Sequence, residues 1–114
     1  MKKLSIFLIV CLAAFFQYCS SSKKASKPVY IPMNYITNIQ PTILANCSPC
    51  HIPPKGFKLA LNTYDAAKTN IDDMIRRINL APAEKGFMPF KHNKLSDSVI
   101  SVFVRWKNDG LLEK

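Results

Sequence analysis

The spacing of two cysteines and a histidine constrains this chain more than any other feature. Cys47, Cys50 and His51 occur as the run Cys-Ser-Pro-Cys-His, so the cysteines are three residues apart and the histidine follows at once. On a tight helical turn, side chains at positions i and i+3 lie on the same side of the chain. Two thiols and an imidazole therefore converge, and the pattern predicts a metal, redox or prosthetic-group site.

Three kinds of site use such a pattern. A structural zinc site needs four Cys or His ligands, and beyond this run the expected domain offers only His92. A thioredoxin-like redox pair belongs to a βαβ context, which the sequence does not show. In the remaining interpretation, the thiols form thioethers with the two vinyl groups of one porphyrin and His51 is the proximal iron ligand. We therefore expect one covalent haem c on Cys47, Cys50 and His51.

Residues 1–18 are typical of a secretory signal. Lys2 and Lys3 form a short positive region, and residues 4–16 form a run of 13 residues that is apolar except for Ser5. A helix needs about 20 apolar residues to span a bilayer, so this run suits the hydrophobic region of a signal peptide better than a membrane anchor. An uncleaved anchor helix is the alternative. Both interpretations predict export to the periplasmic side of a cell envelope.

Cys19 lies just after the apolar run and before a stretch rich in serine and lysine. In this position it is similar to the acylated cysteine of a bacterial lipoprotein, although Gln17 and Tyr18 stand where small residues are usual. The alternative is a plain signal peptidase site between Cys19 and Ala25. Because a lone exported thiol would otherwise be unpaired, we expect lipidation at Cys19 and a flexible tether over residues 19–33.

Residues 34–114 are expected to form one domain of 81 residues. A domain of this size buries little apolar surface and commonly needs a staple, which a covalently held haem would supply. The sequence predicts an all-α domain of about four short helices with long loops around that haem. The expected helices are 39–47, 64–69, 71–79 and a last one between Ser96 and Gly110.

Each expected helix follows a residue type that commonly caps helix N-termini. These candidate caps are Asn38, Thr63, Asn70 and Ser96. Apolar residues recur at helical spacing in the same segments, which predicts one buried face for each helix. The predicted core residues are Ile39, Ile43 and Leu44, then Ile71, Met74, Ile75 and Ile78, then Val99, Ile100, Phe103, Val104 and Trp106.

A haem iron held by His51 has a second axial position on its other side. Met88 is the first candidate for it, because it lies 37 residues after His51 in the helix-free stretch 80–94. His92 in the same stretch is the alternative ligand, and an open position is the third possibility. Met74 falls on the apolar face of an expected helix and is assigned to the core.

Taken together, these features resemble the small class I-type cytochrome c domains of bacterial envelope proteins. The resemblance covers residues 39–112 and is carried by residues 39–44, 59–64, 87–89 and 95–97, together with Trp106 and Gly110. It implies that the first and last helices cross and that Met88 of the Met88-Pro89 pair is the distal ligand. It also implies that the carbonyl of Pro53 or Pro54 accepts a hydrogen bond from His51; the alternative is that these prolines only form a turn. One departure is Phe90, where the family usually has a second proline.

On this basis we expect a one-electron carrier and not an enzyme. A methionine ligand favours reduced iron and raises the reduction potential. A five-coordinate haem that senses a gas or acts as a peroxidase is the second hypothesis, and a haem docking module for a larger oxidoreductase is the third. The sequence shows no additional acid–base group beside the motif, so the enzyme hypothesis depends on an open distal position alone.

The basic character of the chain bears on its partners. The formal net charge is +9, and +7 remains without Lys2 and Lys3. Such a balance suits an acidic protein surface or an anionic membrane. The basic residues are scattered and the expected compartment is extracytoplasmic, so no nucleic-acid partner is expected. We expect redox partner proteins with an acidic docking surface, and membrane attachment through the lipid anchor.

Overall fold

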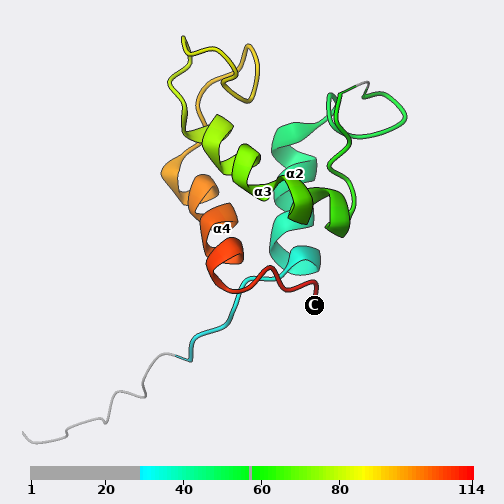
Figure 1. Cartoon of the computed structure of the whole chain (residues 1–114), viewed down its shortest axis with the longest axis vertical. Coiled ribbons are helices and arrows are strands. Elements are labelled where there is room, and N and C mark those ends of the chain that lie inside the picture. Colours follow the sequence, from blue (N-terminus) through cyan, green and yellow to red (C-terminus); the bar gives the residue numbers. More distant parts are fainter. Residues whose placement is uncertain (1–28, 57) are drawn as a thin grey trace, which may run out of the picture. The chain divides into compact units, whose positions relative to one another are not determined.

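Three α-helices and one short π-helical segment make up the regular structure of residues 29–56 and 58–114, which the computed structural model describes. In chain order they are η1 (Tyr35–Ile39), α2 (Gln40–Cys47), α3 (Tyr64–Asn79) and α4 (Asp97–Asn108) (Figure 1). These residues contain no β-strand, which confirms the all-α prediction. The predicted signal segment 1–18 and Cys19 lie outside the described residues.

The first helical segment begins earlier than predicted. Asn34, not Asn38, is its cap, because the Asn34 side chain accepts a hydrogen bond from the Thr37 N–H at 2.8 Å. The Asn38 side chain instead accepts from the N–H of Asn34 at 2.9 Å. The π-helical turn lies directly before Pro41. A proline cannot donate a backbone hydrogen bond and its ring clashes with the carbonyl four residues earlier, so the wider turn accommodates it.

The two helices predicted over residues 64–69 and 71–79 are one continuous helix, α3. Thr63 caps it as expected, accepting a hydrogen bond from the Ala66 N–H at 3.3 Å. Asn70 is not a cap, because its side-chain amide lies within the helix and donates to the Ala66 carbonyl at 2.8 Å. The buried face runs without interruption through this point, over Ala67, Ile71, Met74 and Ile78.

The last helix agrees closely with the prediction. Ser96 caps α4 by accepting a hydrogen bond from the Val99 N–H at 3.4 Å. The helix ends at Asn108, and Gly110 follows with a φ of +90°. Glycine adopts this left-handed conformation without the steric penalty of a Cβ, which is why it commonly ends helices.

One apolar core is shared by all the helices. Its most buried large side chains are Ile39, Ile43, Phe103 and Trp106. Met74 belongs to this core, as predicted. Leu44 does not, because 47% of its surface is exposed. α4 packs against η1 and α3, and an ion pair between Lys107 and Asp72 joins α4 to α3 at 2.6 Å.

The C-terminal residues form hydrogen bonds with the start of η1. The Leu112 carbonyl accepts hydrogen bonds from the Tyr35 N–H and from the Trp106 indole, both at 2.8 Å. Trp106 is fully buried, as expected, and this contact satisfies its indole N–H. The Tyr64 hydroxyl donates to the Leu111 carbonyl at 2.9 Å.

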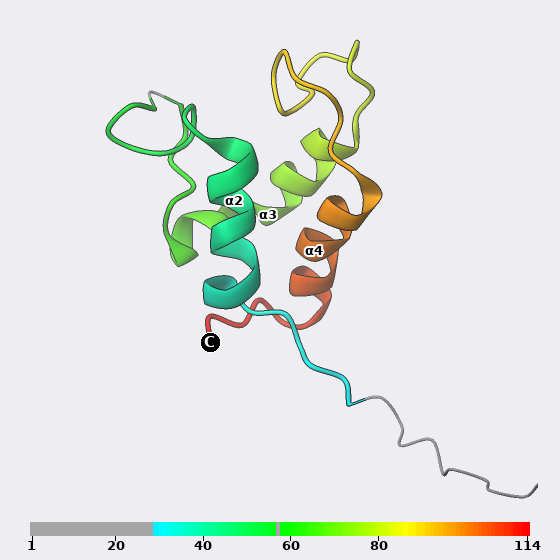
Figure 2. The same cartoon turned by 180° about the vertical axis from the view of Figure 1, so that it is seen from behind.

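The two long loops lie at the other end of the helices. Residues 48–63 join α2 to α3, and residues 80–96 join α3 to α4. Both views show these loops projecting from the end of the fold opposite the C-terminus (Figures 1 and 2). The loop that contains His51 and the loop that contains Met88 therefore project from the same end of the domain. Within the described residues, no helix has both the length and the apolar character that crossing a bilayer requires.

Candidate functional site

The cysteine–histidine run forms one hydrogen-bonded turn at the end of α2. Cys47 is the last residue of the helix. The His51 N–H donates to the Cys47 carbonyl at 3.1 Å, and the Ile52 N–H donates to the Pro49 carbonyl at 3.2 Å. These bonds hold Cys47, Cys50 and His51 on one turn, but Ser48 is extended, so the turn is not the helical one that the spacing predicted.

The two thiols of this turn differ in environment. Cys50 is exposed, whereas Cys47 is partly buried against the core, and both are free thiols. Burial disfavours the charged thiolate and raises the pKa of Cys47 to about 11. At neutral pH the Cys47 side chain is therefore the protonated thiol.

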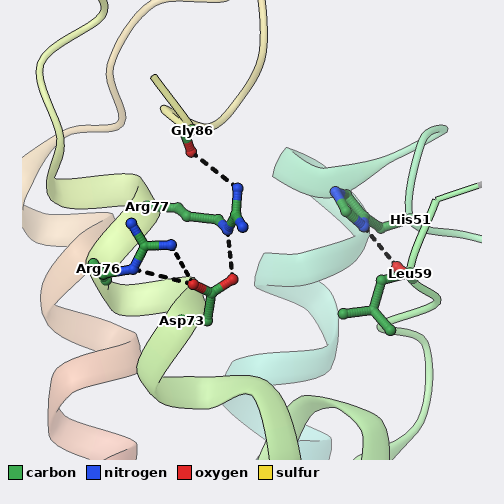
Figure 3. Close-up of polar contacts among 6 residues, drawn as sticks. All are labelled: His51, Leu59, Asp73, Arg76, Arg77 and Gly86. Atoms are coloured by element: carbon green, nitrogen blue, oxygen red, sulfur yellow. Dashed lines mark hydrogen bonds and ion pairs between the residues drawn. The ribbon is translucent and has the colours of Figure 1, made fainter. Parts of the chain in front are cut away.

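The ring of His51 is oriented by a main-chain oxygen. Its Nδ1 atom lies 2.6 Å from the carbonyl oxygen of Leu59 (Figure 3). A carbonyl can only accept, so the contact assigns a proton to Nδ1, which in the neutral ring leaves the lone pair on Nε2. The carbonyls of Pro53 and Pro54, which the resemblance implied as acceptors, do not take this role. The loop beyond them returns past the turn, where the Leu61 N–H donates to the His51 carbonyl at 3.0 Å, and this return brings Leu59 to the ring.

A glycine lets this loop pass close to the turn. A Cβ atom on Gly56 would lie 2.5 Å from the Cys50 carbonyl oxygen and 2.6 Å from that of Pro49. Both neighbours are main-chain atoms, which cannot move aside as a flexible side chain would. Two hydrogen bonds hold the loop in this position. The Gly56 N–H donates to the Ile52 carbonyl, and the Lys58 N–H donates to the Cys50 carbonyl at 3.3 Å. The sequence analysis did not identify Gly56, because the local sequence does not indicate which main-chain atoms the glycine will approach.

The second predicted ligand, Met88, lies in the other loop. Its side chain is partly buried and packs against the core, and its neighbour Phe87 is only 5% exposed. The Met88 N–H donates to the carbonyl of Arg77 in α3 at 3.3 Å. His92, the alternative ligand, is exposed on the same loop.

A charged cluster on α3 supports the Met88 loop. Asp73 accepts hydrogen bonds from both Arg77 and Arg76. These bonds hold the pKa of the Asp73 carboxyl below its usual range, and the bond from Arg77 has the larger effect. Arg77 also reaches the Gly86 carbonyl at 3.4 Å (Figure 3). A spacing of four on a helix is compatible with the Asp73–Arg77 ion pair, but nothing in the local sequence indicates the contact with Gly86.

Several large apolar side chains near these loops are exposed. Leu44 lies one helical turn before Cys47, Leu59 holds the His51 ring through its carbonyl, and Phe90 follows the Met88-Pro89 pair. Their exposed fractions are 47%, 58% and 66%. Large exposed apolar patches commonly mark a surface that a ligand or partner covers, and these three residues are candidates for such a surface.

The candidate site has no counterpart in the comparisons with known proteins. Neither the protein-family models, the curated proteins nor the solved structures contain a match to this chain. The described residues also contain no group of three or more His, Cys, Asp or Glu side chains arranged to hold a bare metal ion. Interpretation of the site therefore depends on its own residues.

Proposed function

We propose that residues 34–114 are a monohaem c-type cytochrome domain that transfers electrons in a bacterial cell envelope. One observation carries the proposal: Cys47 and Cys50 are free thiols on the same turn as a histidine whose Nδ1 proton is held by the Leu59 carbonyl. A histidine that ligates iron needs a free Nε2 and a partner that orients the ring, and His51 has both.

The surrounding residues fit an apolar, covalently attached prosthetic group. Cys47 and Cys50 would hold its edge through thioethers, His51 would ligate the iron from one side and Met88 from the other. Leu44, Leu59 and Phe90 offer apolar surface that a porphyrin would cover. At roughly 25 cal/mol for each Å² of apolar surface removed from water, such coverage would stabilise a domain of only 81 residues.

When bound, haem c supplies a one-electron iron couple, and the protein controls its potential and access. The thioether of Met88 is a soft ligand, which favours the reduced state. Its side chain would also occupy the distal position and keep small molecules out. The half-buried placement of Met88 against the core, compared with the exposed His92, supports Met88 as the distal ligand.

The distribution of charge supports an acidic redox partner. Residues 52–59 and 80–95 carry five lysines and one glutamate, whereas the rest of 34–114 carries six basic and six acidic residues. The net positive charge of the folded domain therefore lies in the two loops that contain or follow the site. The five lysines are all exposed. A positive surface of this kind steers a negatively charged partner toward the site.

Attachment to a membrane completes the proposal and rests on the sequence. Lipidation at Cys19 would tether the domain, and residues 20–33 would let it reorient at the membrane surface. The proposal includes no nucleic-acid partner.

The decisive experiment is expression of the full chain in a bacterium that carries out c-type haem attachment. We expect a haem that stays with the chain on a denaturing gel, and a ferrous spectrum that carbon monoxide does not change at neutral pH. A chain that carries no covalent haem would refute the proposal. Rapid carbon monoxide binding by the wild-type ferrous protein would instead favour a gas sensor or a peroxidase.

A further inference from the structure

Arg77 contacts the loop that carries Met88 at two points. Its carbonyl oxygen accepts a hydrogen bond from the Met88 N–H at 3.3 Å. Its guanidinium donates to the Gly86 carbonyl at 3.4 Å. Main chain and side chain of one residue therefore hold the segment 86–88 at both ends.

The guanidinium is itself held in place. Arg77 Nε donates to Asp73 one helical turn earlier, at 2.5 Å. The guanidinium presents its donors in a rigid planar fork, so the bond to Asp73 fixes the direction in which the remaining donors point. Figure 3 shows the Arg77 side chain between Asp73 and Gly86, with His51 on the opposite side of the view.

The end of α3 depends on the same loop for its hydrogen bonds. The last carbonyls of a helix lack partners within the helix. Here the Arg77 carbonyl is satisfied by Met88, and the Asn79 carbonyl by the Lys94 ammonium at 2.9 Å. The loop is consequently joined to α3 before and after Met88, and an opening of segment 86–88 would expose the Arg77 carbonyl.

We propose that Arg77, oriented by Asp73, is the positioning residue that holds Met88 in place as the distal ligand. This inference rests on the proposed function. Arg77 acts through the backbone of residues 86–88 and does not touch the iron. Its role is to set how often Met88 leaves its position, and hence how readily an external ligand gains access.

The size of the effect follows from the population of the open loop. Carbon monoxide binds only when Met88 has left, so its apparent affinity is proportional to the open fraction. The guanidinium is a charged donor, which strengthens its hydrogen bond to the Gly86 carbonyl, and solvent weakens this bond because Arg77 is partly exposed. Loss of about 1.4 kcal/mol corresponds to about a tenfold increase in the open fraction.

Arg76 provides a matched control. It lies beside Arg77 on α3 and donates to the same Asp73 carboxylate, and within the described residues its hydrogen bonds and ion pair go to Asp73 and not to the loop. Arg77→Gln and Arg76→Gln remove the same charge from the same helix. Asp73→Asn keeps both arginines and replaces the carboxylate that orients them by a neutral amide, which removes the charge but leaves one acceptor oxygen.

The test uses the full chain with its haem and two readouts. Arg77→Gln should raise the carbon monoxide affinity of the ferrous protein about tenfold and speed hydrogen exchange at the Met88 amide by a similar factor. Arg76→Gln should leave both unchanged, and Asp73→Asn should fall between them. Thermal unfolding of each variant separates loop opening from general destabilisation.

Equal behaviour of Arg77→Gln and Arg76→Gln would overturn the positioning role. If wild-type protein carries no haem or lacks Met88 ligation, the proposed function fails. The exchange rate of the Met88 amide in the same variants would still decide whether Arg77 holds the loop. The two failures are therefore distinguishable.

Discussion

The Nδ1 atom of His51 lies 2.6 Å from the main-chain oxygen of Leu59. The acceptor is a backbone atom and cannot be removed by changing a side chain, so the orientation of the ring depends on the path of the loop between the two residues. That path brings Gly56 against the carbonyls of the cysteine turn. The geometry of the histidine and the packing of the loop are therefore one feature of the structure.

Replacement of Gly56 tests this dependence. In Gly56→Ala the new Cβ would meet main-chain oxygens at 2.5 and 2.6 Å, so the loop must move away from the turn. We expect a lower yield of covalently attached haem and a free energy of unfolding reduced by about 1–3 kcal/mol. Haem staining and denaturant unfolding measure the two effects. Lys55→Ala, at an exposed neighbouring position, should change neither.

Replacement of the cysteines tests the attachment. Cys47→Ala or Cys50→Ala should leave one thioether, and the double variant should leave none, because each thiol is expected to bind one vinyl group. Mass spectrometry and haem staining of a denaturing gel count the bonds. Covalent haem on the double variant would contradict the assignment.

The distal ligand is tested by comparing two residues of one loop. Met88→Ala should lower the reduction potential and make the ferrous protein bind carbon monoxide, since the soft thioether would be lost. His92→Ala should alter neither, because His92 is exposed. Redox titration and carbon monoxide difference spectra give the answer. A spectrum changed by His92→Ala and not by Met88→Ala would reverse the assignment.

The helical core is tested by two isoleucines of η1. Ile39 is fully buried, whereas Ile36 is 46% exposed. Ile39→Ala should reduce the free energy of unfolding by about 2–5 kcal/mol through lost burial and the cavity left behind. Ile36→Ala should reduce the free energy of unfolding by much less, because Ile36 is half exposed. Chemical denaturation of both variants under the same conditions makes the comparison, and equal costs would contradict the packing of η1 against α4.

The anchor is tested at Cys19, which lies outside the described residues. If Cys19 is acylated, the mature chain begins there and partitions into detergent. Cys19→Ala should release the protein into the soluble fraction or block its processing. Mass spectrometry of the wild-type N-terminus is the check. A free N-terminus at or after Ser20 would show that the chain carries no lipid.

Local sequence signals were sufficient for much of the helical structure. Thr63 and Ser96 were predicted as caps, and both accept the expected hydrogen bond from a residue three positions ahead. The buried faces of α3 and α4 followed from apolar spacing, and Met74 and Trp106 lie in the core. Caps and faces depend on neighbours within one or two helical turns, which a single sequence displays directly.

Competing local signals were resolved by tertiary packing. Asn70 and Thr63 are both residue types that commonly cap helices. Asn70 nevertheless lies inside α3, because burial of Ala67 and Ile71 favours an unbroken helix. Leu44 fits the apolar spacing of α2 but remains 47% exposed. A spacing rule defines a face, and only the arrangement of neighbouring elements decides how much of that face is covered.

The sequence by itself determined that Cys47, Cys50 and His51 lie near one another, because they fall within five consecutive residues. It could not determine which oxygen orients His51, or that Arg77 would hold Gly86 and Met88. Those contacts join residues 8 to 11 positions apart through loops without regular hydrogen bonding. Such loops take their path from the packing of the whole chain, and only the tertiary structure decided it.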